Sequence, residues 1–231
     1  MSEARQPLRG PVLWALVALP IVLQLAVTTL GIALVGSLVD VPRRMVFFNL
    51  PQQAVVVTAY IAFGAATLLV ARRLGSVREI LAMRRTPLRP AIALTVLGLL
   101  AGLAISALLE PIFHGAESQN LDPGPFPGTA AALVAAALAT LSVVVGASVT
   151  EELYFRGLLQ GQLAIRFARA AAVVGSAGAF GLVHFQPDAF PTLFALGLIL
   201  GLLRLRTGSI WPPIALHAAN NGLAFAYLLA T

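Results

Sequence analysis

The sequence predicts an all-α membrane protein, a polytopic bundle of about seven to eight transmembrane helices. Of its 231 residues, 59% are hydrophobic and only 10% are charged, whereas a soluble domain carries about 25% charged residues. The mean hydropathy is +0.91. The apolar runs are long and lack the alternation of β-strands, which argues against an outer-membrane barrel. We therefore expect helices that cross a lipid bilayer, and the bilayer as a partner of the chain.

Composition excludes several classes of function. The chain has no cysteine, so disulfides, thiolate metal sites and cysteine nucleophiles are excluded. Its net charge of +6 comes from arginine alone, because lysine is absent. The arginines cluster between apolar runs, as determinants of membrane topology do, and form no surface for nucleic acid. We expect no nucleic-acid partner, and no feature of the sequence indicates an oligomeric state.

Seven apolar blocks divide the chain. The first four comprise residues 11–39, 50–71, 90–113 and a block that begins at 129 and runs into the sequence around Glu151; the last three comprise 170–185, 191–203 and 210–229. Each of the first four is long enough to cross a hydrocarbon core of ~30 Å, and the block at 191–203 is short. Polar residues are concentrated in the second half. We therefore interpret residues 1–128 as a scaffold of N-terminal transmembrane helices and residues 129–229 as the functional core.

Arginines predict the orientation in the membrane. Residues 72–89 hold six of the fifteen arginines, which places this segment and the N-terminus in the cytoplasm; Arg43 and Arg44, on the other side, are the exception. Apolar residues recur at helical spacing in the segment, which predicts either a short interfacial helix on the inner leaflet or a solvated basic loop. The lysine-free, alanine-rich composition indicates a bacterial inner-membrane protein.

Charged residues interrupt the fourth apolar block at Glu151, Glu152 and Arg156. An ionisable residue inside a membrane span costs at least ~2.5 kcal/mol on insertion scales, so it is retained where a partner, a wet cavity or a function compensates. On a helix, Glu152 and Arg156 are four residues apart with the acid N-terminal, which favours an ion pair. Glu151 is then left without a partner. We predict that Glu151 is the reactive group and that Glu152 and Arg156 support it.

Two more pairs of residues are spaced by one helical turn. Phe180 precedes His184 by four residues, and His217 precedes Asn221 by four, so each pair shares a helix face. With Glu151, these residues can supply a general base, a proton-relaying imidazole and donors for an oxyanion. No serine or threonine has a comparable setting, which favours attack by activated water. The simpler alternative is that each histidine makes an interhelical hydrogen bond and that Phe180 only packs.

The three motifs, E-E-x-x-x-R, F-x-x-x-H and H-x-x-x-N, together resemble the CPBP family of membrane proteins. This family includes type II CAAX prenyl endopeptidases and bacteriocin-processing or self-immunity (Abi) proteins. The motifs occur in the family's order, and the resemblance covers residues 129–229. It implies an intramembrane endopeptidase, often labelled a metalloendopeptidase, in which Glu151 and His184 activate water. His217 and Asn221 would then stabilise the oxyanion.

The resemblance leaves metal dependence and activity open. Glu151, His184 and His217 are a set that can hold zinc with an open position. The sequence lacks the H-E-x-x-H motif, and we favour a mechanism without a cofactor, similar to the family's metal-free proposal. The expected substrate is a membrane-associated peptide or protein. Two alternatives are a non-catalytic scaffold or self-immunity protein of the same family and, less favoured, a small proton-coupled transporter.

The depth of the motif residues gives a structural prediction. If the fourth helix ended near Phe155, Glu151 would lie only ~6 Å from the end of its span, whereas His184 would lie ~20 Å deep, too far away to share a water. We therefore predict one long helix that continues past Arg156 to about Arg166. Such a helix must tilt, break before Glu151 or project from the bilayer. We also expect a polar cavity that opens to the cytoplasmic side.

Overall fold

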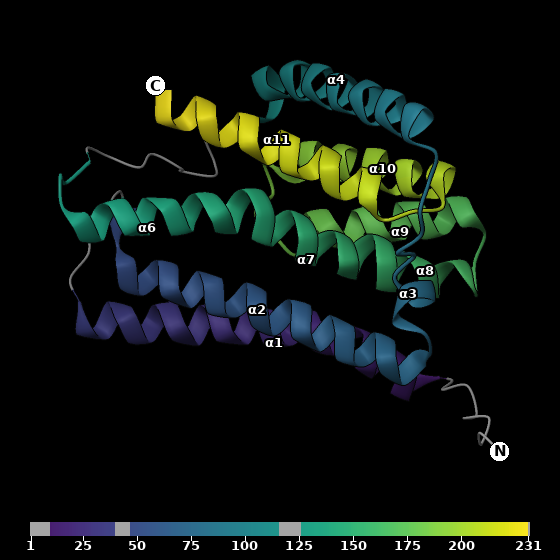
Figure 1. The fold of residues 1–231 in the computed structure, drawn as a ribbon, viewed down its shortest axis with the longest axis horizontal. Coiled ribbons are helices and arrows are strands. Elements are labelled where there is room, and N and C mark those ends of the chain that lie inside the picture. The colour runs from purple at the N-terminus through teal and green to yellow at the C-terminus, as the bar shows by residue number, and fades with distance from the viewer. Residues whose placement is uncertain (1–9, 40–46, 116–125, 231) are drawn as a thin grey trace.

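The computed structural model describes residues 10–39, 47–115 and 126–230. In the first half of the chain, the described helices are α1 (Pro11–Leu38), α2 (Leu50–Leu74), the short α3 (Val77–Ile80) and α4 (Leu88–Phe113). A continuous helical run, Ala130–Ala164, follows. The chain ends with α9 (Arg169–Leu182), α10 (Phe190–Thr207) and α11 (Trp211–Ala230). The helices form a bundle in which α1 and α2 lie side by side along one edge (Figure 1). The predicted all-α bundle is confirmed.

Five of the described helices are long and apolar enough to cross a membrane: α1, α2, α4, Ala130–Ala164 and α10. The block at 191–203, interpreted from the sequence as short, lies within a longer helix. Helix α10 has 18 residues, whereas α9 has only 14 and reaches ~21 Å. Helix α9 ends early because the turn that follows contains Pro187 and a left-handed Phe185. Helix α10 is longer because Arg204 and Arg206 lie in its last turn, where cations suit the helix dipole.

The fourth helix is continuous past Arg156, as predicted. It comprises α6 (Ala130–Leu141), α7 (Ser148–Glu152) and α8 (Gln160–Ala164), joined by two π-helical segments, Ser142–Ala147 and Leu153–Leu159. Its 35 residues reach ~52 Å at ~1.5 Å per residue, and the ribbon changes direction between α6 and α7 (Figure 1). A π segment, rather than an interruption of the helix, therefore precedes Glu151.

Side chains from three neighbouring helices donate hydrogen bonds to carbonyl oxygens of the π segments. The pairs are Asn221 Nδ2 with Val143 O at 3.0 Å, Ser176 Oγ with Phe155 O at 2.8 Å and Arg204 Nε with Arg156 O at 3.2 Å. In a π-helix, a backbone carbonyl no longer accepts from the N–H group four residues later, as it does in an α-helix. Backbone polar groups inside a membrane need protein partners, and here side chains of other helices supply them. The π segments therefore provide attachment points for α11, α9 and α10.

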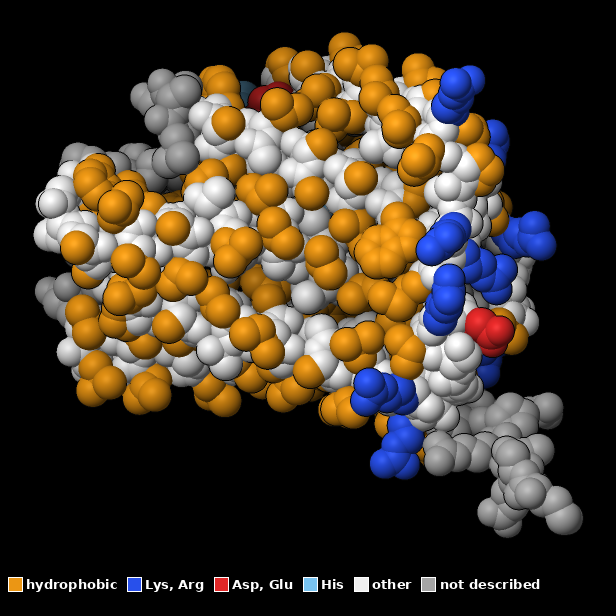
Figure 2. All heavy atoms as spheres, viewed as in Figure 1, with side chains coloured by type: hydrophobic (Ala, Val, Ile, Leu, Met, Phe, Trp, Pro, Cys, Tyr) orange, Lys and Arg blue, Asp and Glu red, His pale blue; other side chains and the backbone are white. Residues whose placement is uncertain are grey.

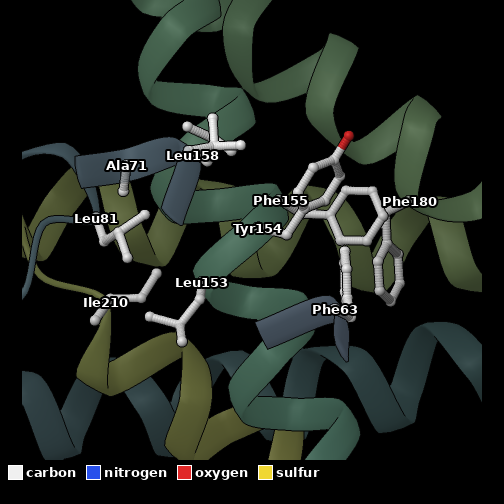
Figure 3. Close-up of a cluster of buried hydrophobic side chains, with 10 residues drawn as sticks. Phe63, Ala71, Leu81, Leu153, Tyr154, Phe155, Leu158, Phe180 and Ile210 are labelled. Carbon is white, nitrogen blue, oxygen red and sulfur yellow. The ribbon is translucent and has the colours of Figure 1, made fainter. Parts of the chain in front are cut away.

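The main apolar core surrounds the long helix (Figure 3). A row of aromatic rings passes through it, from Phe63 on α2 through Tyr154 and Phe155 to Phe180 on α9. Successive ring centroids in this row are 5.1, 4.9 and 5.3 Å apart. The last two contacts are edge-to-face, a favourable arrangement for aromatic pairs. This row fixes the rotation of the long helix relative to α2 and α9.

The basic connection between α2 and α4 folds into the bundle. Leu81, which follows α3, is fully buried, and a Cβ atom on Gly157 would lie 3.1 Å from the Leu81 Cα atom. The carbonyl oxygen of Ala82 accepts a hydrogen bond from Ile210 N at 3.0 Å, and that of Arg84 accepts one from Ser209 Oγ at 2.7 Å. The predicted short helix is present as α3, and its apolar residues pack against the core; its position relative to a membrane surface stays a prediction. The alternative, a solvated basic loop, is wrong, although the arginines of the segment are exposed.

Arginines gather at one end of the bundle, whereas hydrophobic side chains cover its sides (Figure 2). The residues that define this basic end are Arg72, Arg73, Arg78, Arg84, Arg85, Arg89, Arg166, Arg169, Arg204 and Arg206. The start of α1 lies there too, because the Arg166 guanidinium lies 5.3 Å from the ring centroid of Trp14. Arg43 and Arg44 are outside the described residues.

Candidate active site

Glu151 and Glu152 lie in the five-residue α7, between the two π segments, and both are buried. Successive residues of a helix point ~100° apart, so the two carboxylates meet different neighbours. Glu151 Oε1 accepts a hydrogen bond from the Tyr60 hydroxyl of α2 at 3.4 Å. Glu152 Oε1 instead meets Arg156. The two adjacent acids therefore have different environments.

The predicted ion pair between Glu152 and Arg156 is present. Arg156 Nη1 lies 2.8 Å from Glu152 Oε1, and both side chains are fully buried. Arg156 Nη2 donates to Gly197 O of α10 at 3.1 Å. The guanidinium carbon lies 4.5 Å from the Phe180 ring centroid, within range of a cation–π interaction. Arg156 thus links the motif to α9 and α10.

His217 lies between the two acids. Its Nδ1 atom is 3.0 Å from Glu152 Oε1 and its Nε2 atom is 4.0 Å from Glu151 Oε2. An Nδ1–H bond to Glu152 orients the ring, so that Nε2 faces Glu151. Sequence reasoning identified Glu152 only as the partner of Arg156. The contact with His217 joins residues 65 positions apart, and no local spacing reveals it.

His184 follows the end of α9 and is held by its own backbone. Its Nδ1 atom lies 2.7 Å from Phe180 O. Because a carbonyl oxygen only accepts hydrogen bonds, Nδ1 carries the proton and Nε2 of a neutral ring is left as an acceptor. The Phe180 ring contacts both imidazoles edge-on, with centroids 5.0 Å from His184 and 5.7 Å from His217. The structure thus shows Phe180 packing against both histidines.

Glu151 and His184 line the same cavity, which has a volume of about 290 Å³. Helices α1 and α2 line its other side, where Tyr60 is placed against Glu151. A carboxylate and an imidazole therefore line the same cavity. Sequence reasoning missed Tyr60. Its one signal was a tyrosine in an apolar block, since a buried hydroxyl needs a hydrogen-bond partner.

Asn221 hydrogen-bonds to Val143 O of the long helix, and its Oδ1 atom lies 3.5 Å from Asn220 Nδ2. The bond to Val143 O engages one of the two amide donors of Asn221 and leaves the other for a further acceptor. Its role toward an oxyanion stays a prediction.

The candidate zinc set does not assemble in this arrangement. No group of three His, Cys, Asp or Glu side chains in the described part of the chain is placed to hold a metal ion. His184 and His217 each use Nδ1 in another contact and leave Nε2 available, as zinc-binding histidines also do, so the misfit lies in the placement of the three side chains and not in the type of ligand. The residues as placed do not fit a zinc site, and we derive no step through a metal.

Comparison with known families shows which family the second half of the chain resembles. A family model described as type II CAAX prenyl endopeptidase Rce1-like matches residues 130–223. The match covers less than half of the chain but contains Glu151, His184, His217 and Asn221, and it confirms the resemblance read from the motifs. No curated protein and no solved structure matches the chain. With five helices in the described residues that are long and apolar enough to cross a membrane, the chain is an integral membrane protein, and its segment 130–223 is similar to this peptidase family.

Proposed function

We propose that the protein is an intramembrane endopeptidase that cleaves a membrane-associated peptide or protein. The observation that carries this proposal is the cavity that Glu151 and His184 share inside a membrane helix bundle. The similarity of the surrounding segment to a peptidase family supports it. We also retain the division into a scaffold at 1–128 and a catalytic core at 129–229 as a proposal, with Tyr60 as a contribution from the first part.

In the proposed reaction, Glu151 is the general base. Its carboxylate takes a proton from a water that His184 Nε2 helps to orient, and the water oxygen attacks the carbonyl carbon of the peptide bond. The carbonyl oxygen becomes an oxyanion, which a protonated His217 Nε2 and the second amide N–H of Asn221 stabilise. Glu151 then gives the proton to the leaving nitrogen, and the C–N bond breaks. Glu152 positions His217 through Nδ1.

The oxyanion donors should affect turnover more than binding. Loss of one such donor generally costs on the order of 10² to 10³ in kcat, so we expect Asn221→Ala to slow cleavage by about that factor. His217→Ala should be at least as damaging, because the ring contacts both acids. Steady-state kinetics on detergent-solubilised protein measure this. A raised KM with unchanged kcat would instead assign these residues to substrate binding.

The proposed peptidase function is tested by comparing membranes that contain the wild-type protein with membranes that contain the Glu151→Gln variant. Peptides released from membranes that contain the wild-type protein should differ from those released by Glu151→Gln. In parallel, purified protein is incubated with a farnesylated peptide that carries a fluorophore and a quencher on either side of the bond after its prenylated cysteine. Cleavage by the wild type alone supports the proposal. Identical peptides and no cleavage would favour the non-catalytic scaffold or self-immunity alternative.

We further propose that the basic end of the bundle faces the cytoplasm of a bacterium, with the N-terminus on the same side. Positive residues favour the cytoplasmic side, and the start of α1 lies at the basic end. Because the chain has no cysteine, Arg78→Cys offers a single label site at this end. An impermeant maleimide added outside intact cells should not label it.

A further inference from the structure

Helix α1 carries three polar side chains near the middle of an apolar sequence: Gln24, Thr28 and Thr29. All three line the cavity that contains Glu151 and His184. None of the three side chains hydrogen-bonds to any residue within the described ranges. Thr58 and Thr140, also in apolar helices, instead donate to the carbonyl oxygen four residues back, at 2.7 and 2.8 Å. The threonines at the cavity lack this usual internal partner.

Unsatisfied polar groups at this depth indicate a polar ligand. Gln24 lies thirteen residues beyond Pro11, ~20 Å along the helix from the basic end. Lipid chains offer no hydrogen bonds there, and polar residues inside a membrane are retained where they face a partner or a functional cavity. Lipid headgroups lie at the membrane surface, too far away to be the partner.

The spacing of the polar residues matches a peptide main chain. Side chains four residues apart on a helix have Cβ atoms ~5–6 Å apart. An extended peptide repeats its outward N–H and C=O groups every two residues, ~6.6 Å. A carboxamide and a hydroxyl can each both donate and accept, so Gln24 and Thr28 suit adjacent repeats of such a chain. No charged side chain of α1 lines the cavity, which favours recognition of the main chain over charged substrate side chains.

We propose that Gln24 and Thr28 bind the main chain of the substrate peptide, in extended form, on the cavity wall that α1 contributes. This proposal rests on the proposed function and deepens it. It places a substrate-binding element outside residues 130–223, the segment that the peptidase family matches. Thr29, which is exposed, lies at the edge of the same wall and is not required.

Kinetics with the farnesylated fluorogenic peptide test this inference. Gln24→Leu and Thr28→Val should each raise KM about five- to tenfold, the effect of one lost hydrogen bond, with kcat nearly unchanged. Thr28→Ser should restore the wild-type KM. Thr58→Val and Thr140→Val are matched controls that remove a hydroxyl away from the cavity and should change neither constant. Anisotropy of the fluorescent peptide bound to Glu151→Gln protein, with and without the α1 changes, measures binding apart from cleavage.

A second probe keeps the test decisive if a variant does not fold. The same peptide with N-methylated amides around the scissile bond should bind the wild-type protein less tightly, and Gln24→Leu should weaken it little further. Cleavage by the wild type with unchanged KM in both α1 variants would overturn this inference and leave the proposed function intact. A fall in kcat with unchanged KM would indicate that these residues position the attacking water and do not bind the peptide, which would also overturn this inference. If the wild-type protein neither binds nor cleaves the peptide, both this inference and the proposed function are overturned.

Discussion

Glu151→Gln should abolish peptide cleavage while the purified protein remains folded. The amide has the shape of the carboxylate but cannot take a proton from water, and general acid–base catalysis contributes on the order of 10² to 10⁴ in rate. Folding should persist because the contacts of Glu151 are long, 3.4 Å to Tyr60 and 4.0 Å to His217. The amide oxygen can still accept from Tyr60. Turnover measured beside thermal unfolding separates the two effects.

His184→Ala is expected to have the same result, because it removes the second partner of the proposed water. Glu79→Gln is the matched control. Glu79 is an exposed carboxylate of α3, and its neutralisation should leave turnover unchanged. Full activity in Glu151→Gln would falsify the assignment of Glu151 as the general base.

Single substitutions of Glu152 or Arg156 should reduce the amount of folded protein. Both side chains are fully buried, and removal of one partner from a buried ion pair generally costs about 3–5 kcal/mol because the other charge is left uncompensated. Glu152→Leu and Arg156→Met should therefore accumulate poorly and unfold at lower temperature. Yield in membranes and thermal unfolding in detergent measure this. Arg73→Met, which changes an exposed arginine of α2, should behave as the wild type.

The double substitution separates stability from function. Glu152→Leu with Arg156→Met removes both buried charges and should restore accumulation at least in part. Activity should stay low, because His217 Nδ1 then loses the partner 3.0 Å away that orients its ring. If the single substitutions leave yield and thermal stability unchanged, the ion pair is not needed for folding and the support role of Glu152 and Arg156 is wrong.

Local spacing predicted part of this site correctly. The ion pair was predicted because Glu152 and Arg156 are four residues apart on one helix. The continuous helix through Arg156 was predicted from the depth in the membrane at which Glu151 must lie to reach His184. Both arguments use only helix geometry. The all-α class follows from the length of the apolar runs. The number of spans does not, because the sequence predicted seven to eight and only five of the described helices are long and apolar enough to cross a membrane.

The sequence did not predict the contacts between distant segments of the chain. The bonds from Glu152 to His217 and from Tyr60 to Glu151 join different helices, and their formation depends on how those helices pack. The burial of Leu81 has the same origin. Its segment reads as basic and interfacial, but the absence of a side chain at Gly157 leaves room for Leu81 in the core. A pattern read along one helix contains no information on such gaps.

The π-helical segment Leu153–Leu159 also changes the phase of the helix. On a regular helical wheel, Gln160 would lie ~80° from Glu152, eight residues earlier. The extra residue that a π-bulge introduces removes ~100° of this rotation and brings the two within ~20°. Gln160 Nε2 donates to Gly201 O at 3.1 Å, and Arg156 Nη2 donates to Gly197 O, one turn earlier on α10, also at 3.1 Å. The π segment therefore turns Glu152 and Gln160 toward the same side of the long helix, which a regular helical wheel does not show.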